Sequence, residues 1–191
     1  IIGANIGKNF FTKNEDAYKD YLKCLNGLNK YVDYFAINIS SPNTKGLRDF
    51  HDKSLLGPFL KKLINANNKM TKPKPMLLKI SPDLDNTQLD DIIQLVMDLN
   101  IDGVIATNTT TSRDGLMSKY KEETGGLSGM LLKEKSNLII SYLRKKLGNN
   151  IPIIGVGGIM SPQDAIEKFE SGADLVQLYT GFIYEGPGLI K

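Results

Sequence analysis

The stretch INISSPNTKGLR, residues 37–48, begins as an apolar strand and changes into a polar loop at Pro42. Two serines and two asparagines lie within residues 38–43. Polar side chains at the end of a buried strand either satisfy a turn or line a site. The same change from an apolar run to a polar cluster occurs after five other runs, and this repetition predicts the fold.

Six short apolar runs recur along the chain, at residues 1–6, 33–39, 75–80, 101–107, 151–156 and 173–179. Most are continuous rather than alternating, as is typical of strands buried on both faces of a parallel sheet. Segments with helical periodicity lie between them, at 14–31, 54–69, 86–99, 133–147 and from the N-cap Ser161 onward. This order predicts an α/β fold with a parallel sheet.

The polar clusters that follow the strands separate two α/β architectures. They stand at residues 5–8, 38–43, 79–81, 107–109, 155–158 and 179–181. In an open sheet, ligand residues gather at one switch point, whereas a barrel brings all carboxyl ends of its strands to one mouth. The sequence therefore predicts a (β/α)₈ TIM barrel. Because such a barrel needs eight strands and the chain does not start with Met, we expect a fragment of a longer protein.

Composition excludes several classes of function. The net charge of +3 is spread along the chain, which gives no basis for nucleic-acid binding. One cysteine, Cys24, and one histidine, His51, exclude a disulfide framework and a cysteine zinc site, and nothing in the sequence orients His51 for a catalytic triad. We expect no metal site, and we expect His51 to lie in a surface loop.

The glycines of residues 155–158 (GVGG) precede the predicted helix start at Ser161. Glycines there allow backbone N–H groups to approach a phosphate, although they would equally permit a tight turn. The next strand ends in Tyr179, Thr180 and Gly181 at the matching place. Two such ends separated by one helix favour phosphate binding, as in many barrels.

Lys79 ends the buried strand MLLKI and therefore needs an anionic partner, which could be a structural acid or a ligand. Asparagines stand at or after several strand ends, at positions 5, 38, 43 and 108. A single Asn there would normally cap a turn. Four amides at one mouth instead suit a planar ligand with ring carbonyl and N–H groups.

At this point a family resemblance is visible. The strings INISSPNTKGLR, LLKISPD, GVIATNTT, GGLSG, IPIIGVGG and LVQLYTGFIYEGPGLI occur in order along the chain. Together they resemble dihydroorotate dehydrogenase, in its class 2, quinone-linked form. The resemblance implies an FMN-containing barrel enzyme that oxidises dihydroorotate to orotate in pyrimidine biosynthesis and passes electrons to a ubiquinone-type acceptor.

The resemblance also implies roles for individual residues. Ser41 is expected to be the catalytic base that takes the C5 proton of dihydroorotate while hydride passes from C6 to the flavin, with Thr44 or Thr109 as candidates for relaying the proton of Ser41. The implied substrate-binding residues are Asn38, Asn43, Asn108 and Thr109. The implied FMN contacts are Asn5, Asn38, Lys79, Thr107, Ser128, Gly129, Gly157, Gly158, Tyr179 and Thr180, the last four of them near the phosphate.

By the same resemblance, residues 1–191 are a partial FMN-binding barrel domain that covers barrel strands 3 to 8. The N-terminal helices of the quinone tunnel, the first two barrel strands and the C-terminal end are expected to lie elsewhere, so this piece alone should be inactive. Membrane association is expected through the N-terminal region. The predicted location is the mitochondrial inner membrane in a eukaryote or the cytoplasmic membrane in a bacterium.

Three alternatives stay open. A class 1 dihydroorotate dehydrogenase with a soluble acceptor would carry cysteine where this chain has Ser41. A related FMN barrel that reduces pyrimidines would need iron–sulfur domains with cysteine clusters. A non-catalytic phosphate-binding barrel would keep the glycines but would have no need of Ser41, Asn43 and Asn108.

Overall fold

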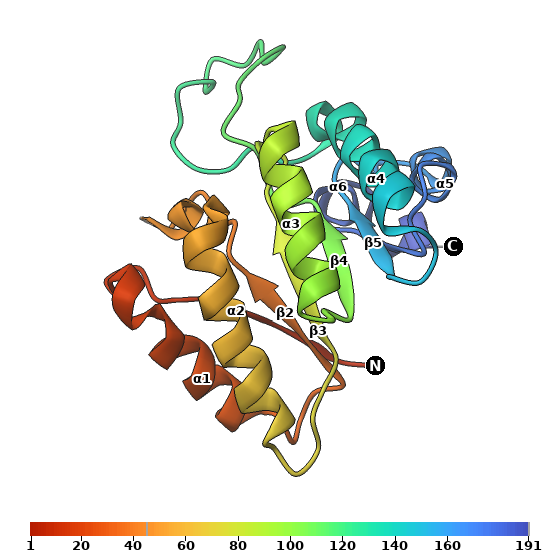
Figure 1. The fold of residues 1–191 in the computed structure, drawn as a ribbon. Coiled ribbons are helices and arrows are strands. Elements are labelled where there is room, and N and C mark those ends of the chain that lie inside the picture. Colours follow the sequence, from red (N-terminus) through yellow and green to blue (C-terminus); the bar gives the residue numbers. More distant parts are fainter. Residues whose placement is uncertain (45, 191) are drawn as a thin grey trace. The chain divides into compact units, whose positions relative to one another are not determined.

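A computed structural model describes residues 1–44 and 46–190, except for the side chain of His51. Figure 1 shows strands and helices in alternation along the chain. The strands are β1 (Gly3–Ile6), β2 (Tyr34–Asn38), β3 (Met76–Ile80), β4 (Gly103–Ala106), β5 (Ile153–Val156) and β6 (Leu175–Gln177). They form one sheet in the order β1-β2-β3-β4-β5-β6, which is their order in the sequence.

All the α-helices except α6 follow the predicted segments closely. They are α1 (Ala17–Leu28), α2 (Lys53–Asn68), α3 (Asn86–Asp98), α4 (Lys133–Leu147), α5 (Pro162–Glu170) and α6 (Thr180–Glu185). Short 3₁₀ helices add η1 (Asn14–Asp16), η2 (Leu47–His51), η3 (Met130–Leu132) and η4 (Gly186–Ile190). The backbone of His51 ends η2, and the prediction about its side chain lies outside the described residues.

The N-termini of three helices show why they begin where they do. Ser161 caps α5, with its hydroxyl accepting from the N–H of Asp164 and Pro162 at the first helical position, as predicted. Asp85 and Gln88 form a capping box on α3. Asp52 caps α2 by accepting from the N–H of Ser54. Each cap satisfies N–H groups that the helix itself leaves without an acceptor.

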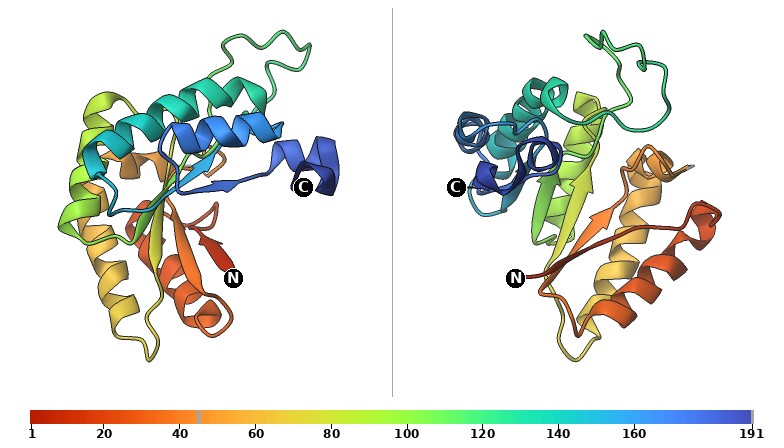
Figure 2. Two further views of the ribbon diagram at one scale, coloured as in Figure 1. Left: turned by 90° about the vertical axis from the view of Figure 1, so that its right-hand side faces the viewer. Right: turned by 180° about the vertical axis from the view of Figure 1, so that it is seen from behind.

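The chain divides into two compact units. Unit 1 contains Ile1–Lys79 and Leu84–Val104, and unit 2 contains Ile80–Asp83 and Ile105–Lys191. In unit 1, helices α1 and α2 lie side by side and α2 contacts α3 (Figure 1). In unit 2, α4 contacts both α5 and β5 (Figure 2).

The strand register in unit 1 assigns side chains to two faces. β1, β2 and β3 pair in parallel, with Asn5 opposite Ala36 and Asn38 opposite Lys79. Because side chains alternate along a strand, Asn5, Asn38 and Lys79 share one face. The other face carries Ile6, Ile37 and Leu78, which are at most 2% exposed. The register therefore separates a polar face at the strand ends from an apolar core.

The end of the chain differs from the sequence-based expectation. The strand predicted over 173–179 is only Leu175–Gln177, and a six-residue helix, α6, begins at Thr180. The predicted site residues Tyr179 and Thr180 are therefore the N-cap and first residue of this helix rather than the end of a strand. α6 stops at Gly186, whose φ of 65° suits a residue without a side chain.

Candidate active site

The carboxyl end of β2 is held by neutral hydrogen bonds. The buried Tyr21 hydroxyl donates to the carbonyl oxygen of Asn38 at 2.6 Å. Ser40, which is 0% exposed, donates its hydroxyl to the carbonyl oxygen of Lys79 at 2.7 Å. Ser40 thus ties the loop after β2 to the neighbouring strand.

Ser41 lies one residue beyond this anchor and is half-buried. Its Oγ accepts a hydrogen bond from the backbone N–H of Asn43 at 3.3 Å. An N–H aimed at the hydroxyl oxygen favours negative charge on that oxygen. Within the described part of the chain, the Ser41 hydroxyl donates its own proton to no protein acceptor. The Ser41 Oγ thus accepts one hydrogen bond, and no described protein group holds the hydroxyl proton.

Lys79 is half-buried on the same face as Asn5 and Asn38. Burial lowers the pKa of its ammonium below the usual range. Among the residues that the structure describes, its Nζ makes neither an ion pair nor a hydrogen bond. A buried cation without a partner is costly unless a ligand supplies one. The structural salt bridge considered for this lysine is therefore not formed within residues 1–44 and 46–190.

In unit 2, the loop after β4 contains Thr107, Asn108 and Thr109. The N–H of Thr107 donates to the carbonyl of Val156 at 2.9 Å, and that of Asn108 donates to the carbonyl of Ile80 at 2.8 Å. The Asn108 side-chain oxygen accepts from the N–H of Thr109 at 2.8 Å. Thr107 is 1% exposed, yet its hydroxyl oxygen has no hydrogen-bond partner in the part of the chain that the structure describes.

Ser128, Gly129 and Thr180 come together although they are far apart in the sequence. The hydroxyls of Ser128 and Thr180 are 2.7 Å apart. Gly129 has a φ of 92°, and a Cβ atom there would lie 3.3 Å from the Thr180 methyl group. Tyr179, in contrast, is 75% exposed.

Gly157 and Gly158 connect β5 to the segment before α5. Their φ angles are 121° and 75°, a region that residues with side chains seldom adopt. A Cβ atom on Gly158 would lie 2.5 Å from the Lys133 Cβ, so only glycine fits there. These glycines thus permit a close packing contact and a left-handed turn. Neither glycine has a side chain that could cover its own backbone N–H group.

These observations together test whether the predicted residues suit FMN. The Thr107 hydroxyl lacks a partner, and so does the Lys79 ammonium among the described residues. Gly157 and Gly158 precede the capped N-terminus of helix α5. Polar groups without a protein partner, together with the backbone N–H groups of two glycines before a helix start, suit a cofactor with a polar ring system and a phosphate. The residues present therefore fit the predicted group.

The predicted residues divide between the units. Unit 1 holds Asn5, Asn38, Ser41, Asn43, Thr44 and Lys79, and unit 2 holds the others. Sequence reasoning missed Asp83 and Lys135, which contact the loop after β4 in unit 2. The one sequence signal for Asp83 is its place after a strand end in the string LLKISPD, and this signal is weak because an acid after a proline in a loop is ordinary.

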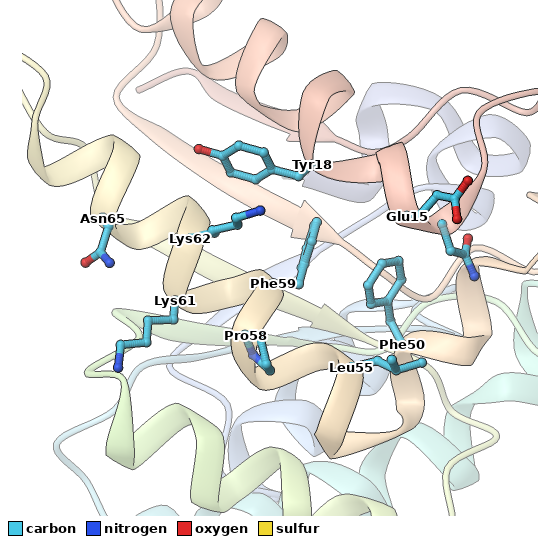
Figure 3. A pocket seen from close by; sticks show the side chains of 10 residues that line it. Glu15, Tyr18, Phe50, Leu55, Pro58, Phe59, Lys61, Lys62 and Asn65 are labelled. Carbon is cyan, nitrogen blue, oxygen red and sulfur yellow. The ribbon is translucent and has the colours of Figure 1, made fainter.

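A surface groove of about 600 Å³ lies elsewhere, on unit 1. Figure 3 shows Phe50, Phe59 and Tyr18 along it, with Lys62 beside Tyr18. The Lys62 Nζ is 5.0 Å from the centre of the Tyr18 ring. None of the predicted site residues lines this groove, so it is separate from the candidate active site.

No helix in residues 1–44 and 46–190 has both the length and the apolar character needed to span a membrane. Within the same ranges, no three His, Cys, Asp or Glu side chains are grouped as a metal site would require.

Comparison with known proteins gives consistent matches. A family model described as dihydroorotate dehydrogenase matches residues 3–191. The protein named dihydroorotate dehydrogenase (quinone) of Christiangramia forsetii is 56% identical over 100% of this chain and 56% of that protein. The protein of the same name from Idiomarina loihiensis is 50% identical over 100% of this chain and 58% of that protein. The chain thus spans little more than half the length of the curated relatives it matches.

Solved structures agree with these matches. Ligand-free DHODH from Eimeria tenella superposes with a TM-score of 0.91 at 36% identity, covering 98% of this chain and 56% of that chain. DHODH from the same organism in complex with ferulenol gives a TM-score of 0.90 at 35% identity, covering 97% and 54%. The predicted fold class, a fragment of a (β/α)₈ barrel, is confirmed.

Proposed function

The chain belongs to the dihydroorotate dehydrogenase family, and we propose that the protein containing it oxidises dihydroorotate to orotate and passes the electrons to a quinone. One observation carries this proposal. Relatives that are 46% to 56% identical over the whole chain bear the name dihydroorotate dehydrogenase (quinone). The serine at position 41 supports the quinone-linked class over the class that has cysteine there.

In this proposal the cofactor is FMN, which when bound supplies the acceptor for the hydride that leaves C6 of dihydroorotate. Lys79 holds the flavin ring system from unit 1 and relieves its own lack of a partner by doing so. Thr107 and the glycines at 157 and 158 contact the cofactor from unit 2, with the glycine N–H groups on the phosphate. The remaining proposed contacts are Asn5, Asn38, Ser128, Gly129, Tyr179 and Thr180.

Ser41 is the proposed base. The N–H of Asn43 donates to its Oγ and so favours the negative charge that this oxygen needs to accept the C5 proton. The proton of Ser41 must leave during this step, and Thr44 or Thr109 is the proposed route by its chemistry. The proposed substrate-binding residues are Asn38, Asn43, Asn108 and Thr109, whose amides and hydroxyl can both donate to and accept from a planar ring.

A quinone acceptor implies a membrane, because quinones with long tails dissolve in lipid. We propose that the whole protein associates with the cytoplasmic membrane if it is bacterial, as the relatives named above are, or with the mitochondrial inner membrane if it is eukaryotic. We further propose that units 1 and 2 are parts of one FMN-binding barrel domain.

The central experiment uses the full-length protein. It should be yellow from bound flavin, and dihydroorotate added without oxygen should bleach the flavin absorbance. Ser41→Ala should keep the flavin and lose most of the rate of bleaching. A colourless protein would refute the proposed function. So would a yellow protein whose flavin stays oxidised after dihydroorotate is added.

The acceptor needs its own measurement. Turnover with a soluble ubiquinone analogue should exceed turnover with fumarate or NAD⁺ at equal concentration. Faster turnover with a soluble acceptor would favour the class 1 alternative instead.

A further inference from the structure

Asp83 lies in the loop after β3, and its side chain is 16% exposed. Its Oδ1 accepts from the Thr110 hydroxyl and from Lys135 Nζ, the latter at 2.9 Å. Its Oδ2 accepts from the N–H of Thr111 at 2.8 Å and from the Thr111 hydroxyl at 3.1 Å. A single carboxylate thus receives hydrogen bonds from two successive residues of the loop after β4 and from helix α4.

These bonds are charge-assisted. Burial by itself raises the pKa of the Asp83 carboxyl, but the hydrogen bonds from Thr110, Thr111 and Lys135 outweigh burial and hold the pKa well below its usual range. Asp83 is therefore ionised at neutral pH. Hydrogen bonds to an ionised acceptor are about twice as strong as those between neutral groups.

The bonds are placed next to the proposed substrate residues. Thr110 directly follows Asn108 and Thr109 in the chain. Its backbone also pairs with Leu127, through hydrogen bonds of 3.1 and 2.8 Å. The Thr110 hydroxyl further accepts from the N–H of Ser112 at 3.0 Å. Hydrogen bonds of both the backbone and the side chain of Thr110 thus hold the segment after Thr109 in place.

We propose that Asp83 is a positioning residue for the substrate: by holding Thr110 and Thr111, it fixes the backbone that presents Asn108 and Thr109. This inference rests on the proposed function. Asp83 touches neither substrate nor cofactor in it and acts through the loop. Lys135 balances the charge of the carboxylate and limits its movement.

The test replaces the carboxylate by its uncharged isostere, Asp83→Asn, in the FMN-loaded full-length protein. Because several charge-assisted bonds are lost, orotate should bind about 10- to 100-fold more weakly. The KM for dihydroorotate should rise by a similar factor, while kcat falls less and bound flavin per protein stays constant. The matched control is Asp85→Asn, which removes a carboxylate two residues away but keeps a good N-cap on α3.

A double-mutant cycle separates positioning from general stability. If Asp83 acts through Asn108, then Asp83→Asn should weaken orotate binding less than about 2-fold when Asn108 is already alanine. Full additivity of the two changes would overturn the proposal. If Asp83→Asn protein does not fold, Thr110→Val tests the same link by removing one hydroxyl donor, and unchanged orotate affinity there would also overturn it.

Failure of the positioning role and failure of the proposed function give different results. A wild-type protein that binds orotate, with an Asp83→Asn variant of equal affinity, overturns the positioning role and leaves the proposed function standing. A wild-type protein that neither binds orotate nor is bleached by dihydroorotate overturns both.

Discussion

Lys79 in unit 1 and Lys168 in unit 2 are both withdrawn from water, and their surroundings differ. Lys168 is 0% exposed and donates to the carbonyl of Lys133 at 3.3 Å and to the side-chain oxygen of Asn137. Lys79 has no such partner among the described residues. A buried lysine that donates hydrogen bonds to acceptors of the protein itself holds helices together. A lysine at a strand end whose ammonium has no protein acceptor indicates a place for a ligand.

The same contrast separates neighbouring residues on the loop after β2. The hydroxyl of Ser40 is fully engaged with the backbone of Lys79, whereas that of Ser41 only accepts. Hydrogen-bond partners thus separate a serine that holds the fold together from the serine that is proposed as the base. Four predictions test this contrast.

The largest effect is expected for Ser41→Ala. Loss of a general base should slow flavin reduction by dihydroorotate about 10²- to 10⁴-fold, with the melting temperature unchanged. Stopped-flow absorbance of the flavin measures the rate. Ser40→Ala is the matched change, and it should instead lower the free energy of unfolding by about 1–3 kcal/mol with a far smaller loss of rate. Equal losses of rate at both positions would remove the distinction.

The next effect concerns the glycines of unit 2. Gly158→Ala should lower the free energy of unfolding by about 3 kcal/mol or more and reduce bound FMN, because its Cβ would meet Lys133 in a left-handed backbone. Gly148→Ala is the control, since its φ of 66° is similar but nothing lies within 4 Å of the added atom. Its ψ of −158° lies in a region that is essentially limited to glycine, so backbone strain alone should cost about 1–3 kcal/mol. Urea unfolding and flavin content distinguish the two.

The two lysines themselves give the third prediction. Lys79→Met should weaken FMN binding about 10-fold, the value of one good hydrogen bond to a charged group, without lowering stability. Lys168→Met should leave FMN affinity unchanged and alter only the free energy of unfolding. Flavin fluorescence titration of the apoprotein measures the affinity. The comparison fails if Lys168→Met weakens FMN binding as much as Lys79→Met does.

The smallest effect is a dependence on pH. Burial lowers the pKa of Lys168 to about 8, and among its charged neighbours Asp164, Glu167 and Glu134 act to raise it while Lys133 lowers it further. Between pH 8 and the ordinary value of 10.5, the unfolded chain binds more protons than the folded one at this position. Stability should therefore rise with pH in this window, by less than about 1.4 kcal/mol per unit.

Lys168→Met should remove this rise while the baseline from other groups remains. Unfolding by urea at several pH values between 8 and 10 measures the slope. A slope that is the same in wild type and variant would contradict the account of Lys168.

Much of the fold could be predicted from the sequence because strand and helix periods are local. The strands of residues 33–39 and 75–80 and the helix start at Ser161 are found where the pattern places them. Helix α6 was missed, since six residues are too few to show a helical period. The strand predicted over 173–179 was too long, because the length of β6 is set by its pairing with β5 and not by a local pattern.

The residue types of the candidate site could be predicted from the sequence, but the residues that hold them in position could not. Asparagine, lysine and glycine at strand ends stand out in the sequence because those types are unusual beside apolar runs. Asp83 does not stand out, because an acid after a proline in a loop is ordinary. Its importance comes from Thr110, Thr111 and Lys135, the last of them 52 positions away.

The sequence alone predicted the α/β order, the N-cap Ser161 and the family, because each depends on local pattern or on residue type, and it singled out Ser41 as the expected base. Only the tertiary structure decided which polar groups have partners. Among the described residues, Ser40 donates to the carbonyl of Lys79, the Lys79 ammonium and the Thr107 hydroxyl have no partner, and Asp83 accepts from Thr110, Thr111 and Lys135. The physical reason is that a hydrogen bond depends on where distant segments meet in space, and no local period in the sequence encodes that meeting.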